Sequence, residues 1–379
     1  MIDETPTFRV LSLDGGGMRG TYTATYLDRV AATFAKRRGI AALDVGAAFD
    51  LIVGTSTGGI IACALAAGVP LVDVVRLYTE HGPSIFSRRL PEGLLGVGTD
   101  IWKRHRALAA GTESLRAALT DRLGTQTLGE IYHERGIALA VPAVEMSQHR
   151  GWVFKTPHLK DTNHRDDYYR LVDVCLATSA APVYRSLAAI DHPDANGTGF
   201  NVFVDGGLWA NNPVLVGLID ALDLTQPGQE IHIFCLGTCP MPAGDQIAKT
   251  DVDRGLPEWR FGGEAAGLSI DAQQFAFDHM AKKLARHVDR KCTVIRFPSE
   301  KVPAALIPYL GLDETRQEAI QALINQARTD ADMTNSRCAY ADTDPDAALI
   351  CALFDSAPAR TDPLVSRTSR RPPGHLKTL

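Results

Sequence analysis

A serine with a glycine two residues away on each side stands at position 56, in the segment Gly-Thr-Ser-Thr-Gly. A largely apolar run precedes the segment, and small and branched residues follow it. A strand, a tight turn that carries serine and a helix form a nucleophile elbow. Gly54 and Gly58 would supply clearance and permissive backbone angles, and helix N-terminal amides stabilise negative charge beside the serine. The spacing predicts that Ser56 is the nucleophile of an acyl-transfer enzyme.

A second glycine-rich segment, Asp-Gly-Gly-Gly-Met-Arg-Gly at 14–20, follows the apolar run 8–13. Its glycines also fit the dinucleotide-binding fingerprint, so a dinucleotide-dependent oxidoreductase is a rival hypothesis. That fold places an acidic residue at the end of its second strand, where it holds a ribose hydroxyl. Here the corresponding strand runs into Ser56. The oxidoreductase hypothesis therefore lacks the acidic residue that should hold the ribose.

In an acyl-transfer enzyme the same loop has another use, because consecutive exposed amides can bind an oxyanion. The expected donors are the amides of Gly15, Gly16 and Gly17. Arg19 would orient this loop or hold a phosphate.

A third segment, Asp205-Gly206-Gly207, follows the extended apolar run 200–204. Such a segment on its own is a common turn.

Together and in this order, the three motifs resemble those of the patatin-like phospholipase family. The segments Ala-Thr-Ser-Ala-Ala-Pro at 177–182 and Asn-Asn-Pro at 211–213 resemble that family as well. The resemblance covers about residues 8–220. It implies an α/β protein with a three-layer α/β/α fold and a central, mostly parallel sheet. No cofactor is implied.

The resemblance also implies a Ser-Asp dyad: Ser56 attacks, Asp205 takes its proton, and the amides of the glycine loop hold the oxyanion. Supporting roles fall to Arg19 and to four glycines: Gly54, Gly58, Gly206 and Gly207. A three-member serine site would need an oriented histidine. The nearest candidates, His81, His158 and His164, lie in no comparable motif. We expect them to be surface or packing residues, since a positioned carboxylate can serve as the base.

Composition limits the function further. The chain has 379 residues and a formal net charge of -5, which gives no argument for a nucleic-acid polymer as partner. The N-terminus lacks the basic and apolar regions of a secretory signal, and no stretch reaches the roughly 18 apolar residues of a membrane-spanning helix. We expect a cytoplasmic protein that at most touches the inner membrane face. The seven cysteines suggest no disulfide framework and no zinc spacing, so we expect no metal.

Strand and helix signals alternate along the chain, which favours a parallel or mixed sheet between helical layers. The expected strands are 8–13, 49–54, 137–144, 152–156, 200–204 and 231–237, and the expected helices are 20–36, 57–67, 168–180, 214–222 and 313–329. Segment 83–130 reads as a loop-rich basic connection, and 275–291 as an amphipathic helix packed on the domain. We expect a catalytic core at 8–240, an extension at 241–355 packed on it, and a basic, proline-containing tail at 356–379.

These features predict a lipid acyl hydrolase that releases fatty acids from phospholipids at a membrane surface through an acyl-serine intermediate. The alternatives are a carboxylesterase or lysophospholipase of general lipid metabolism and a patatin-shaped binding protein. The layout also resembles, more loosely, bacterial patatin-like effectors of anti-phage defence that cyclic nucleotides activate. A cyclic di- or trinucleotide would need cations, for which the basic stretches Arg88-Arg89, Lys103 to Arg106 and Lys282 to Arg290 are candidates.

Overall fold

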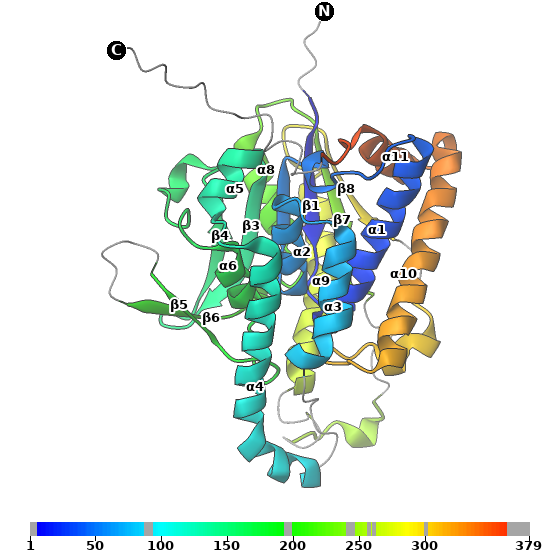
Figure 1. Cartoon of the computed structure of the whole chain (residues 1–379). Helices are drawn as coiled ribbons and strands as arrows, with labels where there is room; N and C mark the ends of the chain where they lie inside the picture. The colour runs from blue at the N-terminus through cyan, green and yellow to red at the C-terminus, as the bar shows by residue number, and fades with distance from the viewer. Residues whose placement is uncertain are drawn as a thin grey trace, which may run out of the picture.

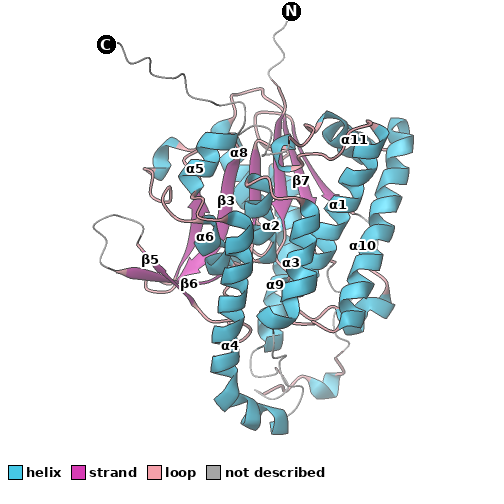
Figure 2. Cartoon of the chain, in the orientation of Figure 1, coloured by secondary structure: helices cyan, strands magenta, loops and turns pink. Residues whose placement is uncertain are grey.

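A computed structural model describes residues 6–86, 94–192, 199–239, 247–255, 259, 263–298 and 302–361. One sheet runs through the middle of the molecule and helices cover both of its faces (Figure 1, Figure 2). The described strands are β1 (Phe8–Leu13), β2 (Leu51–Gly54), β3 (Ala138–Glu145), β4 (Arg150–Lys155), β5 (Ala188–Asp191), β6 (Phe200–Asp205), β7 (Ile231–Leu236) and β8 (Cys292–Phe297).

The eight described strands form one sheet in the order β5-β6-β3-β2-β1-β7-β8, with β4 paired to β3. Strands β8, β7, β1, β2 and β3 are parallel, whereas β4 and β6 run antiparallel to β3, and β5 runs antiparallel to β6. The central, mostly parallel sheet expected from the sequence is therefore confirmed.

Strands β2 and β6 both pair with the same edge of β3: β2 pairs with its first residues and β6 with its last. Strand β2 pairs with β3 as far as Val53, opposite Ala140, and β6 ends with Asp205 opposite Ala143. Strand β4 pairs with residues 140–145 along the other edge. Three residues of strand span about 10 Å. The turn after β2 and the end of β6 therefore meet above the same stretch of β3.

The described helices of the chain are α1 (Gly20–Arg37), α2 (Thr57–Ala66), α3 (Leu71–Ile85), α4 (Leu94–Leu123), α5 (Leu128–Arg135), α6 (Leu171–Thr178), α7 (Gly207–Ala210), α8 (Val214–Leu224), α9 (Gly263–Leu284), α10 (Gln317–Arg337) and α11 (Pro345–Ser356). The five expected helices lie close to α1, α2, α6, α8 and α10, with ends that differ by up to eight residues.

Two hydrophobic cores lie on opposite faces of the sheet, because successive strand residues point to opposite faces. On β1, Val10 packs in a core with α8 residues such as Val214 and Leu218, and Phe277 of α9 packs against it. Its neighbour Leu11 belongs to the larger core, which includes residues of α1, α2, α3, α6 and α10. The sheet between these layers gives the three-layer α/β/α fold.

One expectation about local structure is wrong, and the bounds of another differ from those observed. Segment 83–130 is mostly helical, because α4 runs from Leu94 to Leu123 and α3 continues to Ile85. The helix expected at 275–291 begins at Gly263, ends at Leu284 and leads into β8. Strand β8, at 292–297, was not expected, although it has six residues like β1, which was. Phe277 packs against the core, but Phe275 is 80% exposed, so the expected packing of the apolar face holds only in part.

Residues after 240 share the sheet and the core with the earlier residues. Strand β8 pairs with β7, and α10 packs along α1, where the hydroxyl of Tyr22 donates to Asp330 at 2.5 Å. The expected boundary at residue 240 stays a prediction, and most of the expected tail, from residue 362 on, lies outside the described residues. Among the helices that the structure describes, none is both long and apolar enough to cross a membrane.

Candidate active site

Ser56 stands on a tight turn between β2 and α2, with φ 54° and ψ -122°. This left-handed backbone is uncommon for a residue other than glycine and stores strain at functional turns. A Cβ at Gly54 would lie 2.3 Å from the Gly58 carbonyl oxygen, and one at Gly58 would lie 2.3 Å from the Leu13 carbonyl oxygen. Both flanking glycines are therefore required by backbone contacts, as the nucleophile-elbow interpretation predicts.

The side chain of Ser56 meets that of Asp205. Its hydroxyl donates to Asp205 Oδ2 at 2.7 Å, and both residues are buried, at 9% and 5% exposure. The Ser56 amide donates to Thr178 Oγ1 at 2.9 Å, and the Thr178 hydroxyl donates to the Pro142 carbonyl at 2.6 Å. Strand β3 and helix α6 thus hold the elbow in place, and the structure joins two residues that are 149 positions apart.

The environment of Asp205 makes its carboxylate a stronger base than an exposed one. The pKa of Asp205 is raised from 3.8 to about 6, and burial is the main cause. The hydrogen bonds from Ser56 and the Gly207 amide and the nearby charge of Arg185 act in the opposite direction and offset part of the rise. The Gly207 amide donates to Asp205 Oδ1 at 2.7 Å. A Cβ at Gly206 would lie 2.3 Å from the Pro142 carbonyl oxygen. The Asp-Gly-Gly turn therefore fixes the carboxylate close to the sheet.

This pKa predicts the pH dependence of hydrolysis. If Asp205 is the base, kcat/KM rises tenfold per pH unit below about 6 and is constant above it, because only the ionised carboxylate accepts a proton. A neutral soluble ester such as p-nitrophenyl butyrate avoids ionisation of the substrate in this measurement. A profile that stays flat from about pH 5 to pH 8 would contradict the assignment.

The glycine loop after β1 lies beside Ser56, but its three amides are not equivalent. The Gly15 amide donates to the Asn211 carbonyl at 2.9 Å and is occupied there. Gly16 and Gly17 line the pocket around Ser56, and their amides donate to no carbonyl of the described residues. The geometry therefore favours Gly16 and Gly17 as oxyanion donors and corrects the expectation for Gly15.

Close contacts and buried charges fix the position of this loop. A Cβ at Gly17, where φ is +56°, would lie 2.3 Å from the Leu312 carbonyl oxygen. Arg19 is buried, and its Nε donates to the Gly16 carbonyl at 3.4 Å. Arg19 is not among the described residues that line the pocket. Of its two expected roles, orienting the loop therefore fits the structure and holding a phosphate in the pocket does not.

The first residue of the loop, Asp14, forms a buried ion pair with a residue that sequence reasoning missed. Arg296 of β8 contacts Asp14 at 2.7 Å and Asp278 of α9 at 3.0 Å. Burial raises the pKa of Asp14 to about 6, while Arg296 lowers it. Because removing one partner of a buried ion pair is costly, strand β8 and helix α9 help to hold the glycine loop after β1 in place.

Helix α9 also contacts the segment that follows Asp205. Gln273 accepts from the Asn211 amide at 3.0 Å and donates to the carbonyls of Gly207 and Leu208 at 3.2 and 3.3 Å. Ile270 lines the pocket. No sequence motif marked this helix as part of the site, because these contacts depend on the fold rather than on a local pattern.

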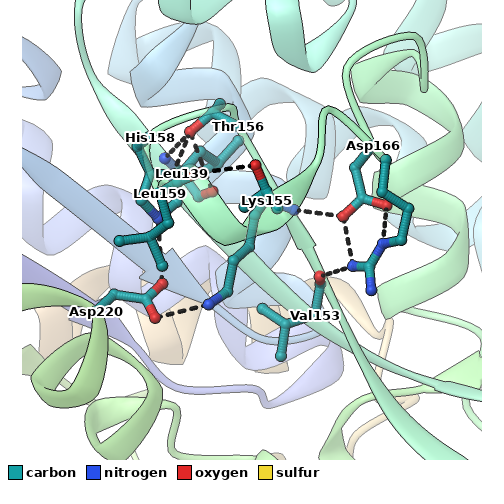
Figure 3. Close-up of polar contacts among 10 residues, drawn as sticks. Leu139, Val153, Lys155, Thr156, His158, Leu159, Asp166 and Asp220 are labelled. Atoms are coloured by element: carbon teal, nitrogen blue, oxygen red, sulfur yellow. Dashed lines mark hydrogen bonds and ion pairs between the residues drawn. The ribbon is translucent and has the colours of Figure 1, made fainter. Parts of the chain in front are cut away.

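The candidate histidines lie away from Ser56. His158 is fully buried beside Asp220, with its Nε2 3.2 Å from Asp220 Oδ2 and its Nδ1 2.7 Å from Thr156 Oγ1 (Figure 3). His164 is largely exposed and pairs with Asp167. None of the three histidines is among the described residues that line the pocket around Ser56. His158 is therefore a packing residue, and Asp205 is the titratable group that contacts the serine.

The pocket around Ser56 has mostly apolar walls, formed by residues such as Ile60, Leu77, Ile85 and Leu115. These side chains come from α2, α3 and α4, on the face that also carries the larger core. Such walls suit a hydrocarbon chain, because burial of each CH₂ group contributes about 0.8 kcal/mol. The polar groups Ser56 and Asp205 lie on one wall, so a fatty ester can reach them.

The basic stretches expected to bind a nucleotide have mixed outcomes. Arg88 and Arg89 lie outside the described residues, as does the side chain of Lys103. Lys282 pairs with Asp278 at 2.9 Å, and Arg290 donates to the Thr225 carbonyl at 3.0 Å and pairs with Asp289. Lys282 and Arg290 of the third stretch therefore have partners within the protein.

The family model described as patatin-like phospholipase matches residues 11–218. A cGAMP-activated phospholipase of Pseudomonas aeruginosa is 38% identical over 280 residues, which are 73% of this chain and 75% of that protein. Proteins of the same name in Escherichia coli and Vibrio cholerae are 32% and 34% identical over 62% and 55% of this chain, and over 63% and 56% of their own lengths. The chain belongs to the patatin-like phospholipase family.

Proposed function

We propose that this chain hydrolyses the carboxylic esters of phospholipids through an acyl-Ser56 intermediate, with Asp205 as the base. The observation that carries the proposal is the 2.7 Å hydrogen bond from the Ser56 hydroxyl to Asp205 Oδ2 in a mostly apolar pocket. Membership of a family of lipid-ester hydrolases supports it. The strained elbow supports it too, since strain of this kind collects at functional sites.

In the first half of the reaction, Ser56 Oγ attacks the ester carbonyl carbon and its proton passes to Asp205. The carbonyl oxygen becomes an oxyanion, which the amides of Gly16 and Gly17 stabilise. The tetrahedral intermediate collapses, the bond from carbon to the alcohol oxygen breaks, and Asp205 returns the proton to the leaving lysophospholipid. The fatty acyl group stays on Ser56.

In the second half, water takes the place of the alcohol. Asp205 removes a proton from the water as it attacks the acyl carbon, and the same amides hold the second oxyanion. Collapse of this intermediate breaks the bond to Ser56 Oγ, which recovers its proton from Asp205. A free fatty acid leaves, and both residues return to their starting protonation states.

The relatives named cGAMP-activated phospholipase support a further step of the proposal, in which a cyclic nucleotide activates this chain. The setting of this activation would be anti-phage defence, as the looser resemblance of the sequence suggests. The chain's own contacts offer a physical route for such control. Helix α9 touches the segment after Asp205 through Gln273. Its Asp278 also pairs with Arg296, which pairs in turn with Asp14 at the start of the glycine loop. A ligand that prefers one position of α9 would shift the population of competent sites.

Fatty-acid release from phosphatidylethanolamine and phosphatidylglycerol vesicles tests this proposal. We expect little release by the purified protein alone and an increase of about 100-fold or more with one cyclic dinucleotide, since coupling and population shifts of this size are common. The hydrolysed linear dinucleotide is the matched control. High release without nucleotide would contradict the regulated function and indicate a constitutive lipid hydrolase. No release with any cyclic di- or trinucleotide would contradict phospholipid hydrolysis itself.

A further inference from the structure

An arginine that no sequence motif singled out lies in the wall of the pocket around Ser56. Arg185 follows α6, and its amide donates to the Ala181 carbonyl at 2.9 Å, which closes the turn that brings it there. The residue is only 6% exposed, and it lines the same pocket as Ser56 and Asp205. A cation in this position is costly, because burial removes it from water.

The guanidinium of Arg185 is not satisfied by the protein. Among the residues that the structure describes, none is a hydrogen-bond partner of its buried Nε. Burial lowers its pKa only to about 10, so the group is charged at neutral pH. Buried polar groups are nearly always paired, and an exception calls for a missing partner such as a ligand.

Arg185 is also the sole Lys, Arg or His among the described residues that line this pocket. The other charged lining residue is Asp205, whose field raises the pKa of Arg185. Arg19, the arginine of the glycine loop, does not line the pocket. A negative group on a bound substrate would therefore find one cation within the pocket.

We propose that Arg185 binds the phosphodiester of the lipid substrate and thereby selects phospholipids over neutral esters. This inference rests on the hydrolase function proposed above and adds a specificity-determining residue to it. A guanidinium presents parallel N–H donors that match two oxygens of a phosphate. In a glycerophospholipid the phosphate is a few bonds from the acyl esters. The apolar walls would take the acyl chain while Arg185 takes the phosphate.

The charge of Arg185 also offsets a repulsion at the site. Above pH 6 the Asp205 carboxylate is ionised, and a phosphodiester brought close to it would meet a like charge. A neutral ester is not repelled by Asp205 and has no phosphate for Arg185 to bind. Loss of Arg185 is therefore expected to act on phosphate-bearing substrates selectively.

Two substrates with the same acyl esters, one with and one without a phosphodiester head group, test the proposal. Dioleoylphosphatidylcholine and dioleoylglycerol are presented in the same mixed micelles of a nonionic detergent, and kcat/KM is measured for each with the fully activated protein. Arg185→Gln is expected to lower kcat/KM for the phospholipid by about 10- to 100-fold, the range of a hydrogen bond to a charged group. We expect kcat/KM for dioleoylglycerol to change by no more than about threefold, and Arg185→Lys to recover part of the loss.

The matched control is Arg29→Gln, which removes an exposed arginine of α1 that pairs with Asp332 of α10 and does not line the pocket. It should leave both values of kcat/KM unchanged. Thermal unfolding of each variant separates loss of folded protein from loss of specificity. A selective loss on the phospholipid in a folded variant supports the proposal.

Other results would overturn it in distinct ways. Equal losses on both substrates, with the acid limb of the neutral-ester profile moved to higher pH, would show that Arg185 acts only by lowering the pKa of Asp205. Unchanged kcat/KM for both would show that the residue has no part in binding. If wild-type protein hydrolysed neither lipid in a Ser56-dependent manner, the hydrolase function would fail, and this inference with it.

Discussion

Replacing Ser56 by alanine is expected to lower fatty-acid release by about 10⁶-fold, the loss seen when a serine nucleophile is removed from a working site. No other hydroxyl among the described residues donates to Asp205, so no neighbour can take the role. The fold should survive, because the Ser56 hydroxyl makes this one hydrogen bond and contributes little to packing. The measurement is the initial rate of fatty-acid release from vesicles with saturating activator.

The matched control for this variant is Ser336→Ala. The Ser336 hydroxyl lies on α10, where it donates to the Asp332 carbonyl, and it is remote from the pocket. We expect wild-type rates from this control and melting temperatures within a few degrees of wild type from both variants. A folded Ser56→Ala protein that still released fatty acid at more than about one hundredth of the wild-type rate would exclude Ser56 as the nucleophile.

Replacing Asp205 by asparagine is expected to lower kcat by about 10²–10⁴-fold, the usual contribution of a positioned base. Asparagine keeps the shape and can still accept the hydrogen bond from the Gly207 amide through Oδ1. It cannot accept the proton of Ser56. The variant should also lose the rise of kcat/KM with pH near 6, because burial and its neighbours set that value for Asp205 itself.

The Asp205→Asn variant can also distinguish activation of Ser56 from binding of the lipid. Its KM for phospholipid should stay close to that of wild type or fall below it, since asparagine removes a like charge near the phosphate and no contact with the head group is lost. Its reaction with a fluorophosphonate probe should slow in parallel with kcat. Fast labelling of Ser56 in this variant would mean that another group activates the hydroxyl, and the dyad would be wrong.

Much of the fold could be predicted because the strands that carry motifs are short, apolar and followed by glycine-rich turns. The runs before Asp14, Ser56 and Asp205 became β1, β2 and β6, and Gly54 and Gly58 lie where backbone contacts exclude a side chain. In such segments local chemistry and the global fold point to the same answer.

The parts of the site that escaped prediction depend on contacts between distant segments. The Gly15 amide was expected to face the oxyanion, but the carbonyl of Asn211, on the turn after α7, accepts its hydrogen bond. Helix α9 reaches the site through Gln273, and β8 reaches it through Arg296. None of these contacts has a local sequence signal, since each forms only when the sheet brings its strands together.

The role proposed for Arg185 could not be predicted from the sequence either. In the sequence it is one of many basic residues and follows the Ala-Pro turn without a motif. Its burial, its unpaired Nε and its place in the pocket wall become visible only in the folded chain. The long helix α4 was missed for a related reason: the glycines in its first turns suggested a loop, although the low helix propensity of glycine is only a weak preference.

The most direct test of the central claim is the site at which a fluorophosphonate probe binds covalently. Activated protein is labelled to completion, digested, and the modified peptide is identified by mass spectrometry. The dyad predicts a single adduct on Ser56, with loss of fatty-acid release in proportion to labelling. An adduct on another residue that abolishes release, or full release from protein labelled quantitatively at Ser56, would contradict the claim that Ser56 is the nucleophile.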